Sequence, residues 1–339
     1  MTNETIKRYK HFADNFLYTQ KYNLEFRVLD TLSTLSGKPL RNKALAKTYG
    51  RSIIREVFKV MNQDAENFTK GIYPESLKPK EDLLKHLKSF SLILKDYPSV
   101  IWRRYKNKTT LDDSSDYPQY FNRSFHFQTD GYTSEHSARL YEHQVEILFG
   151  GMANVMRRAM IEPLQKHLKM ENPLVLEIAA GTGIGSRILS KVYPKAHITA
   201  TDISEEYIQY SKEKFSDYKN IEFLAQDATS LTYECEIFDL TFQIFLLHEL
   251  PEKERKLAIE EQVRVTKKDG LVVIIESLQT HDAPEWKEIL EDFPRKYHEP
   301  FYRNYIANPI EPILEELGVE IISHKKVLFS KVILGRKKG

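Results

Sequence analysis

From Pro173 onward, short apolar runs alternate with segments of helical pattern, and this rhythm restricts the possible folds more than any other feature of the chain. Five such runs cover residues 174–179, 197–202, 221–227, 238–247 and 270–277. Most of the segments between them place apolar residues at helical spacing. Because strands and helices alternate over this length, we expect a parallel sheet with helices on both faces.

The end of the chain departs from this alternation. The stretch "VEIISHKKVLFSKVILGRKK" contains two strand-like runs, and the turn between them is too short for a helical crossover. Two strands joined in this way pair antiparallel. The sequence therefore predicts a mostly parallel sheet whose last strand is antiparallel.

The first 115 residues instead follow a helical pattern throughout. Apolar residues recur at mostly helical spacing in the first segment, and they are Phe12, Phe16, Leu24, Val28 and Leu32. The segments "SIIREVFKVM" and "EDLLKHLKSFSLIL" are also amphipathic, whereas "NKTTLDDSSDYP" (107–118) has the composition of a linker. We predict a helical accessory domain over 1–115, a linker with a helix that covers the active site over 116–150, and a larger domain over 151–339.

Composition excludes several classes of function. The net charge of +2 over 339 residues argues against nucleic acid as a partner. No stretch approaches the ~20 apolar residues of a membrane span, and the segment "MTNETIKRYKHF" lacks the apolar core of a signal peptide, so we expect a cytoplasmic protein without a membrane partner. Since Cys235 is the only cysteine, the chain has neither an intrachain disulfide nor a cysteine-based zinc site.

A glycine-rich stretch, "EIAAGTGIG" (177–185), stands where the first predicted strand turns into a helix. It lacks the Lys-Ser/Thr pair of a phosphate-binding P-loop. Its third glycine, Gly185, comes one position too early for the dinucleotide fingerprint. Glu177 would oppose a pyrophosphate but suits a ligand that carries an ammonium group. Both phosphate interpretations are therefore weakened.

Two further acids close the next two predicted strands. Asp202 follows Glu177 by 25 residues and can accept hydrogen bonds from two ribose hydroxyls, and Asp227 follows after another 25 residues, where it can accept from the amine of adenine. The carboxyl ends of neighbouring parallel strands form the crevice in which such sheets bind ligands. Three acids and a glycine loop without a phosphate motif describe a ligand with adenine, ribose and an amino acid, as in S-adenosylmethionine.

These motifs carry a family resemblance. Residues 174–339 resemble a class I S-adenosylmethionine-dependent methyltransferase, with "LEIAAGTG" similar to its first motif, "TD" at 201–202 to its ribose-binding acid and "QDA" at 226–228 to its adenine-binding motif. The resemblance implies an α/β, Rossmann-like sheet of seven strands with an N-terminal all-α domain. It also implies cofactor contacts, to the methionine part, the ribose and the adenine, from Glu177, Ala179, Gly181, Gly183, Asp202, Ile203, Asp227 and Ala228.

The acceptor side is less defined. The stretch 120–151 contains a possible cap at Ser134 and an aromatic and histidine-rich entry, and it resembles a small-molecule, quinone-methyltransferase-like branch of the family. His248, just past the fourth strand, has the unperturbed pKa of a general base. Proton transfer or acceptor contact is expected from His248, His143 and His126, and acceptor contact from Tyr132, His136, Tyr297, Tyr302 and Arg303.

Several alternatives stay open at this level. A histidine pair with a carboxylate can bind a metal, but the spacing of His136 and His143 is looser than that of a helical ligand pair, so we expect no metal. The main hypothesis is methyl transfer to a small organic molecule by in-line displacement, with S-adenosylhomocysteine as product. The rivals are a methyltransferase that acts on protein or RNA, and a non-catalytic S-adenosylmethionine-binding module. The helical domain is a candidate surface for a homodimer.

Overall fold

The computed structural model describes residues 2–77, 82–111 and 117–339, which group into two compact units. The helical unit comprises the residues up to 156 together with 295–298, and the sheet unit comprises 157–294 and 299–339. Residues 112–116, the centre of the predicted linker, lie outside the described residues. The predicted domain boundaries therefore stay a prediction.

The helical unit contains three long helices and one shorter helix. They are α1 (Asn3–Leu35), α2 (Lys43–Thr69), α3 (Leu83–Lys106) and α4 (Glu135–Leu148), with the short 3-10 turns η1 (Glu75–Leu77) and η2 (Phe125–Phe127). The predicted cap is confirmed, because Ser134 accepts a hydrogen bond from Ser137 N at the start of α4. Helix α1 packs against α2, α3 and α4.

Helix α1 buries a face that its apolar pattern does not predict. The buried positions repeat at helical spacing but are mostly polar, and they are His11, Asn15, Thr19, Tyr22, Glu25, Leu29 and Ser33. In contrast, Leu24 is 63% exposed and Leu17 is 62% exposed. The helix itself is as predicted, but hydrogen bonding to neighbouring helices, rather than burial of its apolar residues, decides which side faces inward.

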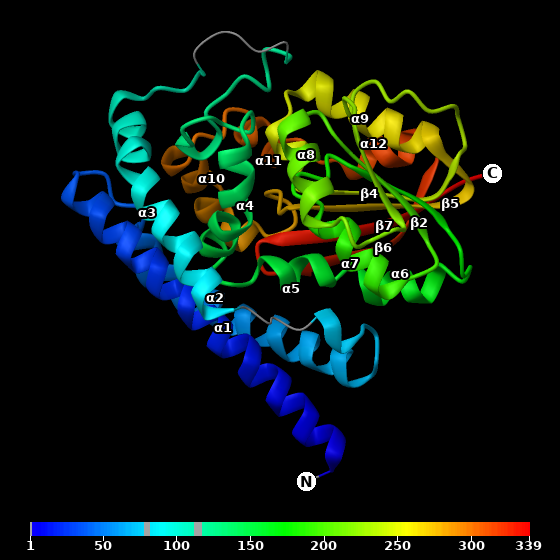
Figure 1. The fold of residues 1–339 in the computed structure, drawn as a ribbon, viewed down its shortest axis with the longest axis horizontal. Helices are drawn as coiled ribbons and strands as arrows, with labels where there is room; N and C mark the ends of the chain where they lie inside the picture. Colours follow the sequence, from blue (N-terminus) through cyan, green and yellow to red (C-terminus); the bar gives the residue numbers. More distant parts are fainter. Residues whose placement is uncertain (1, 78–81, 112–116) are drawn as a thin grey trace. The chain divides into compact units, whose positions relative to one another are not determined.

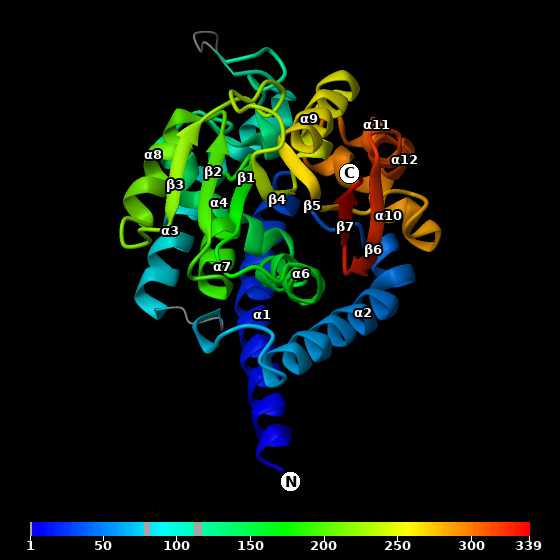
Figure 2. The ribbon, with the colours of Figure 1, turned by 90° about the vertical axis from the view of Figure 1, so that its right-hand side faces the viewer.

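The sheet unit is built on one seven-stranded sheet. Its strands are β1 (Leu174–Ile178), β2 (His197–Asp202), β3 (Ile221–Ala225), β4 (Phe238–Ile244), β5 (Thr266–Ser277), β6 (Val319–Val327) and β7 (Ser330–Lys337). They lie in the order β3-β2-β1-β4-β5-β7-β6, which Figure 2 shows from left to right. Strands β1 to β5 are parallel, and β7 is antiparallel to both β5 and β6. The predicted fold class is confirmed.

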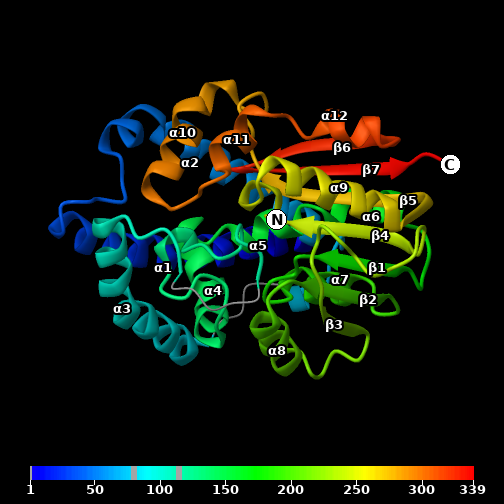
Figure 3. The same ribbon diagram turned by 90° about the horizontal axis from the view of Figure 1, so that it is seen from above.

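Helices cover the sheet on both faces. Four of them contact the strands, namely α7 (Ile184–Val192), α8 (Glu205–Lys214), α9 (Glu252–Val265) and α12 (Glu311–Glu316). The other elements of this part of the chain are α5 (Ala153–Arg158), α6 (Ile161–His167), α10 (Lys287–Lys296) and α11 (Tyr302–Ala307), with the 3-10 turns η3 (Leu247–Glu249) and η4 (Pro284–Trp286). Helices α9 and α12 lie on one side of the strands and α6 and α7 on the other (Figures 1 and 3). In the described part of the chain, no helix has the length and apolar character needed to cross a membrane.

Candidate functional site

Glu177 is the first acid of the site and lies buried at the end of β1. Its Oε2 accepts hydrogen bonds from Ser186 N at 2.6 Å and from Ser186 Oγ at 2.5 Å. Among the described residues, nothing donates a hydrogen bond to Oε1. Burial raises the pKa of Glu177 to about 8, although the Ser186 hydrogen bonds and the charge of Arg157 act in the opposite direction. A carboxyl in this state is poised to ionise when a cationic group binds beside it.

Asp202 ends β2 and is also buried. Its two oxygens accept from backbone donors, Oδ2 from Gly181 N at 2.8 Å and Oδ1 from Ser204 N at 2.9 Å. Burial raises the pKa of Asp202 to about 6 despite both bonds. A carboxylate has about four acceptor positions, so Asp202 retains capacity for the two hydroxyls of a ribose.

The glycine loop is shaped by steric limits as well as by hydrogen bonds. Gly183 has φ +73°, and an added Cβ would lie 2.6 Å from Phe223 Cε1. A Cβ on Gly185 would collide with Glu177 Oε1. Ala179, directly after β1, has φ +53°, a conformation that non-glycine residues adopt rarely. Gly183 N donates to Ala180 O, so the predicted loop residues act largely by bringing the backbone close to Glu177 and Asp202.

The predicted adenine contacts follow β3. Asp227 Oδ1 accepts from Thr229 N and Thr229 Oγ1, both at 2.8 Å, which fixes the carboxylate. Ala228 N donates no hydrogen bond within the described residues, as an adenine-binding N–H would require. Ile203, next to Asp202, is half-buried. The ends of β1, β2 and β3 are neighbours in the sheet, so all of these groups belong to one edge.

His248 lies in η3, after β4, and is held by Glu276. His248 Nδ1 is 2.6 Å from Glu276 Oε1, and the same carboxylate accepts from Leu247 N and Ser277 N. Burial by itself lowers the pKa of His248, but the charge and hydrogen bond of Glu276, with smaller effects of Glu299 and Glu249, raise it to about 9. The ring is therefore oriented by its Nδ1, and its proton is held more tightly than in an ordinary histidine.

A second layer of side chains fixes this turn. The buried Arg255 donates to Leu247 O at 2.8 Å and to Leu250 O at 2.9 Å. The ring of Tyr302 meets His248 edge-on at 5.7 Å, and its hydroxyl lies 2.6 Å from Ser277 Oγ. Tyr302, predicted to contact the acceptor, thus packs behind the histidine, whereas Arg303 is exposed.

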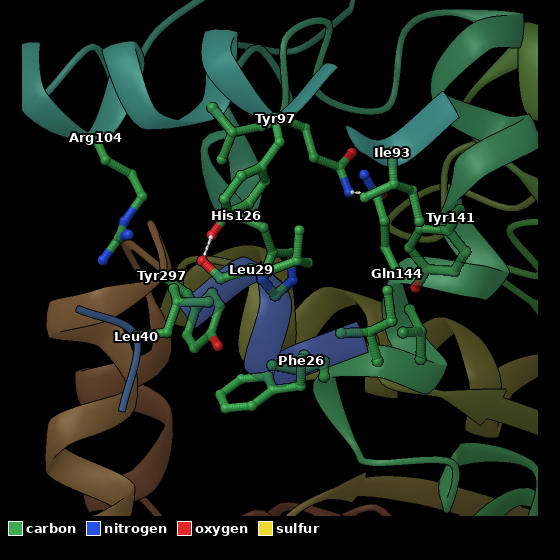
Figure 4. A pocket seen from close by; sticks show the side chains of 15 residues that line it. Phe26, Leu29, Leu40, Ile93, Tyr97, Arg104, His126, Tyr141, Gln144 and Tyr297 are labelled. Atoms are coloured by element: carbon green, nitrogen blue, oxygen red, sulfur yellow. Dashed lines mark hydrogen bonds between the residues drawn. The ribbon is translucent and has the colours of Figure 1, made fainter. Parts of the chain in front are cut away.

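Two other predicted acceptor residues meet in the helical unit. His126 and Tyr297 line one pocket there, with their rings edge to face at 5.8 Å (Figure 4). His126 and Phe127 have φ of +53° and +58°. Two consecutive non-glycine residues in this conformation store backbone strain, which is typical of functional sites. His126 N also donates to His298 O at 3.2 Å, which ties the loop to the segment 295–298.

The remaining predicted residues of the helical unit lie apart from that pair. His143 Nε2 is 2.8 Å from Glu25 Oε2, and His86 Nε2 is 2.7 Å from Glu25 Oε1, so one buried carboxylate binds both rings. Tyr132 is buried and stacks on Phe125 at 5.2 Å. His136 is exposed. The catalytic and acceptor roles of these residues stay predictions.

Sequence reasoning missed four residues that fix side chains predicted for the site. Ser186 fixes Glu177, Glu276 and Arg255 fix the His248 turn, and Glu25 fixes His143. A carboxylate at the end of the fifth strand, in "VVIIES", was a detectable signal for Glu276. Arg255 lies within an ordinary amphipathic helix, and no local pattern distinguishes it.

Comparison with known proteins finds matches over part of the chain. Residues 175–270 match the family model described as "Methyltransferase domain". The chain is 30% identical over 155 residues to a demethylmenaquinone methyltransferase of Thermotoga maritima, which covers 44% of this chain and 64% of that protein. It is 34% identical over 105 residues to a demethylmenaquinone methyltransferase of Staphylococcus aureus, which covers 31% of this chain and 43% of that protein.

The chain thus spans between two fifths and two thirds of the length of these relatives. Among solved structures, it is similar to a SAM dependent methyltransferase from Aquifex aeolicus, with 24% identity, a TM-score of 0.41, and coverage of 52% of this chain and 88% of that one.

Proposed function

We propose that this chain, whose residues 175–270 match a methyltransferase family model, is a class I S-adenosylmethionine-dependent methyltransferase that transfers a methyl group to a small organic acceptor. One observation carries the proposal. Glu177 and Asp202 are buried around a glycine loop, their pKa values are raised, and no lysine, arginine or histidine among the described residues forms an ion pair with either. Such acids suit a ligand that brings its own positive charge and hydroxyl groups.

Each part of the cofactor has a candidate partner. Glu177 would hold the ammonium group, with the backbone around Ala179, Gly181 and Gly183 beside the methionine part. Asp202 would accept from the ribose hydroxyls, with Ile203 against the adenine, while Asp227 and Ala228 N would bind the adenine edge. Bound S-adenosylmethionine supplies an activated methyl group on its sulfonium.

The chain's own contribution to the chemistry is alignment and proton transfer. Holding two reactants in line lowers a barrier by ~7–11 kcal/mol, whereas a general base contributes ~10²–10⁴-fold. His248 is the proposed base, because its Nδ1 is committed to Glu276 and its Nε2 is the nitrogen left for an acceptor proton. Glu276 is a positioning residue that sets the orientation and the pKa of the ring.

A small-molecule acceptor is the finer part of the proposal. The two relatives are named as methyltransferases of demethylmenaquinone, which is not a macromolecule, and the net charge of +2 offers no general attraction for RNA. A cytoplasmic location and a homodimer through the helical unit belong to the same proposal. A methyltransferase acting on protein, and a domain that binds the cofactor without turnover, are the alternatives that the experiment below separates.

The first experiment uses S-adenosylmethionine labelled in its methyl group, incubated with purified protein and an extract of the host cell. Label in the small-molecule fraction supports the proposal and allows the product to be identified by mass. Label in protein or RNA contradicts the acceptor class. Binding of S-adenosylhomocysteine without any transfer contradicts the enzymatic function.

The cofactor site is tested separately. Asp202→Ala should weaken S-adenosylhomocysteine binding at least ~100-fold in calorimetry. The reason is that the two ribose hydroxyls of the ligand lose the carboxylate that would accept their hydrogen bonds. The control is Asp217→Ala, an exposed acid after α8, which should bind like the wild type. If the two variants bind equally, the assignment of the ribose site is wrong.

A further inference from the structure

The helical unit contains a pocket whose walls are almost entirely apolar (Figure 4). Side chains of α1, α3 and α4 form it, among them Phe26, Ile93 and Val145. About 750 Å³ of space between its walls is not filled by atoms, and part of this space is open solvent. Aromatic rings from His126 and Tyr297 complete one wall, so the pocket suits a flat or extended apolar body.

One charged side chain reaches this apolar space. Arg104, near the end of α3, is the only lysine, arginine, aspartate or glutamate among the lining residues that the structure describes, and it is 7% exposed. Its Nη1 donates to Ser33 Oγ at 3.1 Å and to Lys38 O at 3.0 Å. Its Nε and Nη2 have no partner in the described part of the chain. The guanidinium is thus anchored by one nitrogen, and two N–H-bearing atoms on its other edge are available.

No described carboxylate neutralises this cation. Asp30, whose charge acts on the adjacent Tyr97, accepts from Leu40 N and Arg41 N at 2.8 Å each and forms no ion pair with Arg104. Neither Nε nor Nη2 of Arg104 is fully buried, but the side chain as a whole is 7% exposed, and charges with so little solvent around them are normally paired in proteins. The same unit follows this rule elsewhere, since Glu25 is bound by two histidines.

The other polar groups around the pocket already have partners within the protein. Tyr97 Oη is 2.6 Å from Ser33 Oγ and donates to Leu29 O at 3.2 Å. Gln128 Nε2 donates to Gln144 Oε1 at 2.8 Å. Few hydrogen-bonding positions are left for a ligand with many polar groups, which argues against a sugar or a nucleotide in this space.

We propose that this pocket binds a monocarboxylate with an apolar or aromatic body, whose carboxylate pairs with the Nε and Nη2 edge of Arg104. A single cation calls for a single negative charge, and a carboxylate matches two parallel N–H donors in one plane. The apolar walls then take up the body of the ligand. The argument from Arg104 does not rest on the proposed methyl transfer, although His126 and Tyr297, which are predicted to contact the acceptor, line the same pocket.

The first test varies the ligand and leaves the protein unchanged. The full chain, in chloride buffer at pH 7 without S-adenosylmethionine, is titrated calorimetrically with decanoate and 4-phenylbutanoate and with the corresponding alcohols. At least one carboxylate should bind about 30-fold or more tightly than its alcohol, as expected when a buried charge gains its partner. Equal affinity of acid and alcohol, or no binding of either acid at millimolar concentration, overturns the proposal.

The second test varies the charge on the protein. Arg104→Gln should bind the tighter carboxylate about 30-fold or more weakly while its affinity for the alcohol stays within about threefold. Arg139→Gln, an exposed arginine on α4, is the matched control and should bind like the wild type. Circular dichroism checks that the variant is folded, and the ligand comparison above stands even if it is not. An Arg104→Gln chain with unchanged carboxylate affinity overturns the proposal, whereas the S-adenosylhomocysteine titration decides the methyltransferase question separately.

Discussion

Buried acids of the helical unit differ from the two acids beside the glycine loop of the sheet unit. In the helical unit, Glu25 is bound by His86 and His143, and Asp64 lies 2.8 Å from both His11 Nε2 and Asn15 Nδ2. In the sheet unit, the glycine-loop acids receive hydrogen bonds only from neutral donors, and their pKa values are raised. An acid that already has a basic partner holds helices together. An acid without one is available to a charged or hydroxylated ligand.

The largest effect is expected from a variant that moves the Glu177 side chain without replacing it, because this variant tests whether Glu177 is available to a ligand. Gly185→Ala places a Cβ against Glu177 Oε1 and 2.9 Å from Ile244 Cδ1, so the carboxylate and the loop must move. We expect S-adenosylhomocysteine binding to be lost within the range of calorimetry.

The matched control for this change is Gly50→Ala in α2, where an added Cβ meets nothing within 4 Å. This variant should keep wild-type affinity and gain up to ~1 kcal/mol of stability from helix propensity. Wild-type binding by Gly185→Ala would show that the position of Glu177 does not matter for the cofactor.

Removal of the Glu25 carboxylate from the helical unit should lower the stability of the fold rather than the affinity for the cofactor. Glu25→Ala leaves two buried imidazoles without their partner, and we expect a loss of about 3–5 kcal/mol in the free energy of unfolding by urea. The exposed Glu135→Ala, which removes an ion pair with Arg139, should change it by less than ~1 kcal/mol.

The same variant tests the predicted catalytic role of His143. If His143 only packs, the turnover of folded Glu25→Ala protein stays near that of the wild type. If Glu25→Ala keeps its stability but loses turnover, Glu25 and His143 take part in catalysis. In that case the paired acids of the helical unit do more than stabilise its packing.

His248 is paired with a buried acid, as the histidines of the helical unit are, but it is also the proposed catalytic base. His248→Ala should lower turnover about 100-fold, at the low end of the range for a general base, while the exposed His197→Ala should not. Since Glu276 raises the pKa of His248 to about 9, wild-type turnover should rise with pH toward 9. In Glu276→Gln the midpoint should move to lower pH, which a purely structural role of Glu276 would not produce.

The smallest expected effect is the pH dependence of cofactor binding. Unliganded Glu177, with a pKa of about 8, carries a proton at neutral pH and must release it when an ammonium group binds. The affinity for S-adenosylhomocysteine should therefore fall by up to tenfold for each pH unit below about 8. Calorimetry in buffers of different ionisation enthalpy should detect the released proton, and Glu177→Gln should flatten the dependence. A flat wild-type profile would mean that Glu177 is already ionised.

Much of the sheet unit was predictable because its signals are local. Glu177 and Asp202 lie at the ends of β1 and β2, Asp227 follows β3 by two residues, and parallel strands bring such ends to one edge whatever the helices do. The short turn between β6 and β7 leaves only antiparallel pairing. Ser134 caps α4 by accepting a hydrogen bond from Ser137 N, only three positions further along the sequence.

The long-range pairs were not predictable in this way. His143 and Glu25 are separated by 118 residues, and His248 and Glu276 by 28. Nothing in the spacing of these residues distinguishes them from surface histidines and acids. The buried polar face of α1 could not be predicted for the same reason, because the hydrogen-bond partners of its side chains lie on other helices.

The sequence by itself thus determined the fold class, the strand that reverses and the gathering of three acids at one edge of the sheet, because these depend on periodicity and on where each strand ends. Only the tertiary structure decided which side of α1 is buried, which acid orients each histidine, and that Arg104 ends in an apolar pocket. Those outcomes depend on desolvation and on donors and acceptors that meet only when distant segments pack, and no local pattern encodes them.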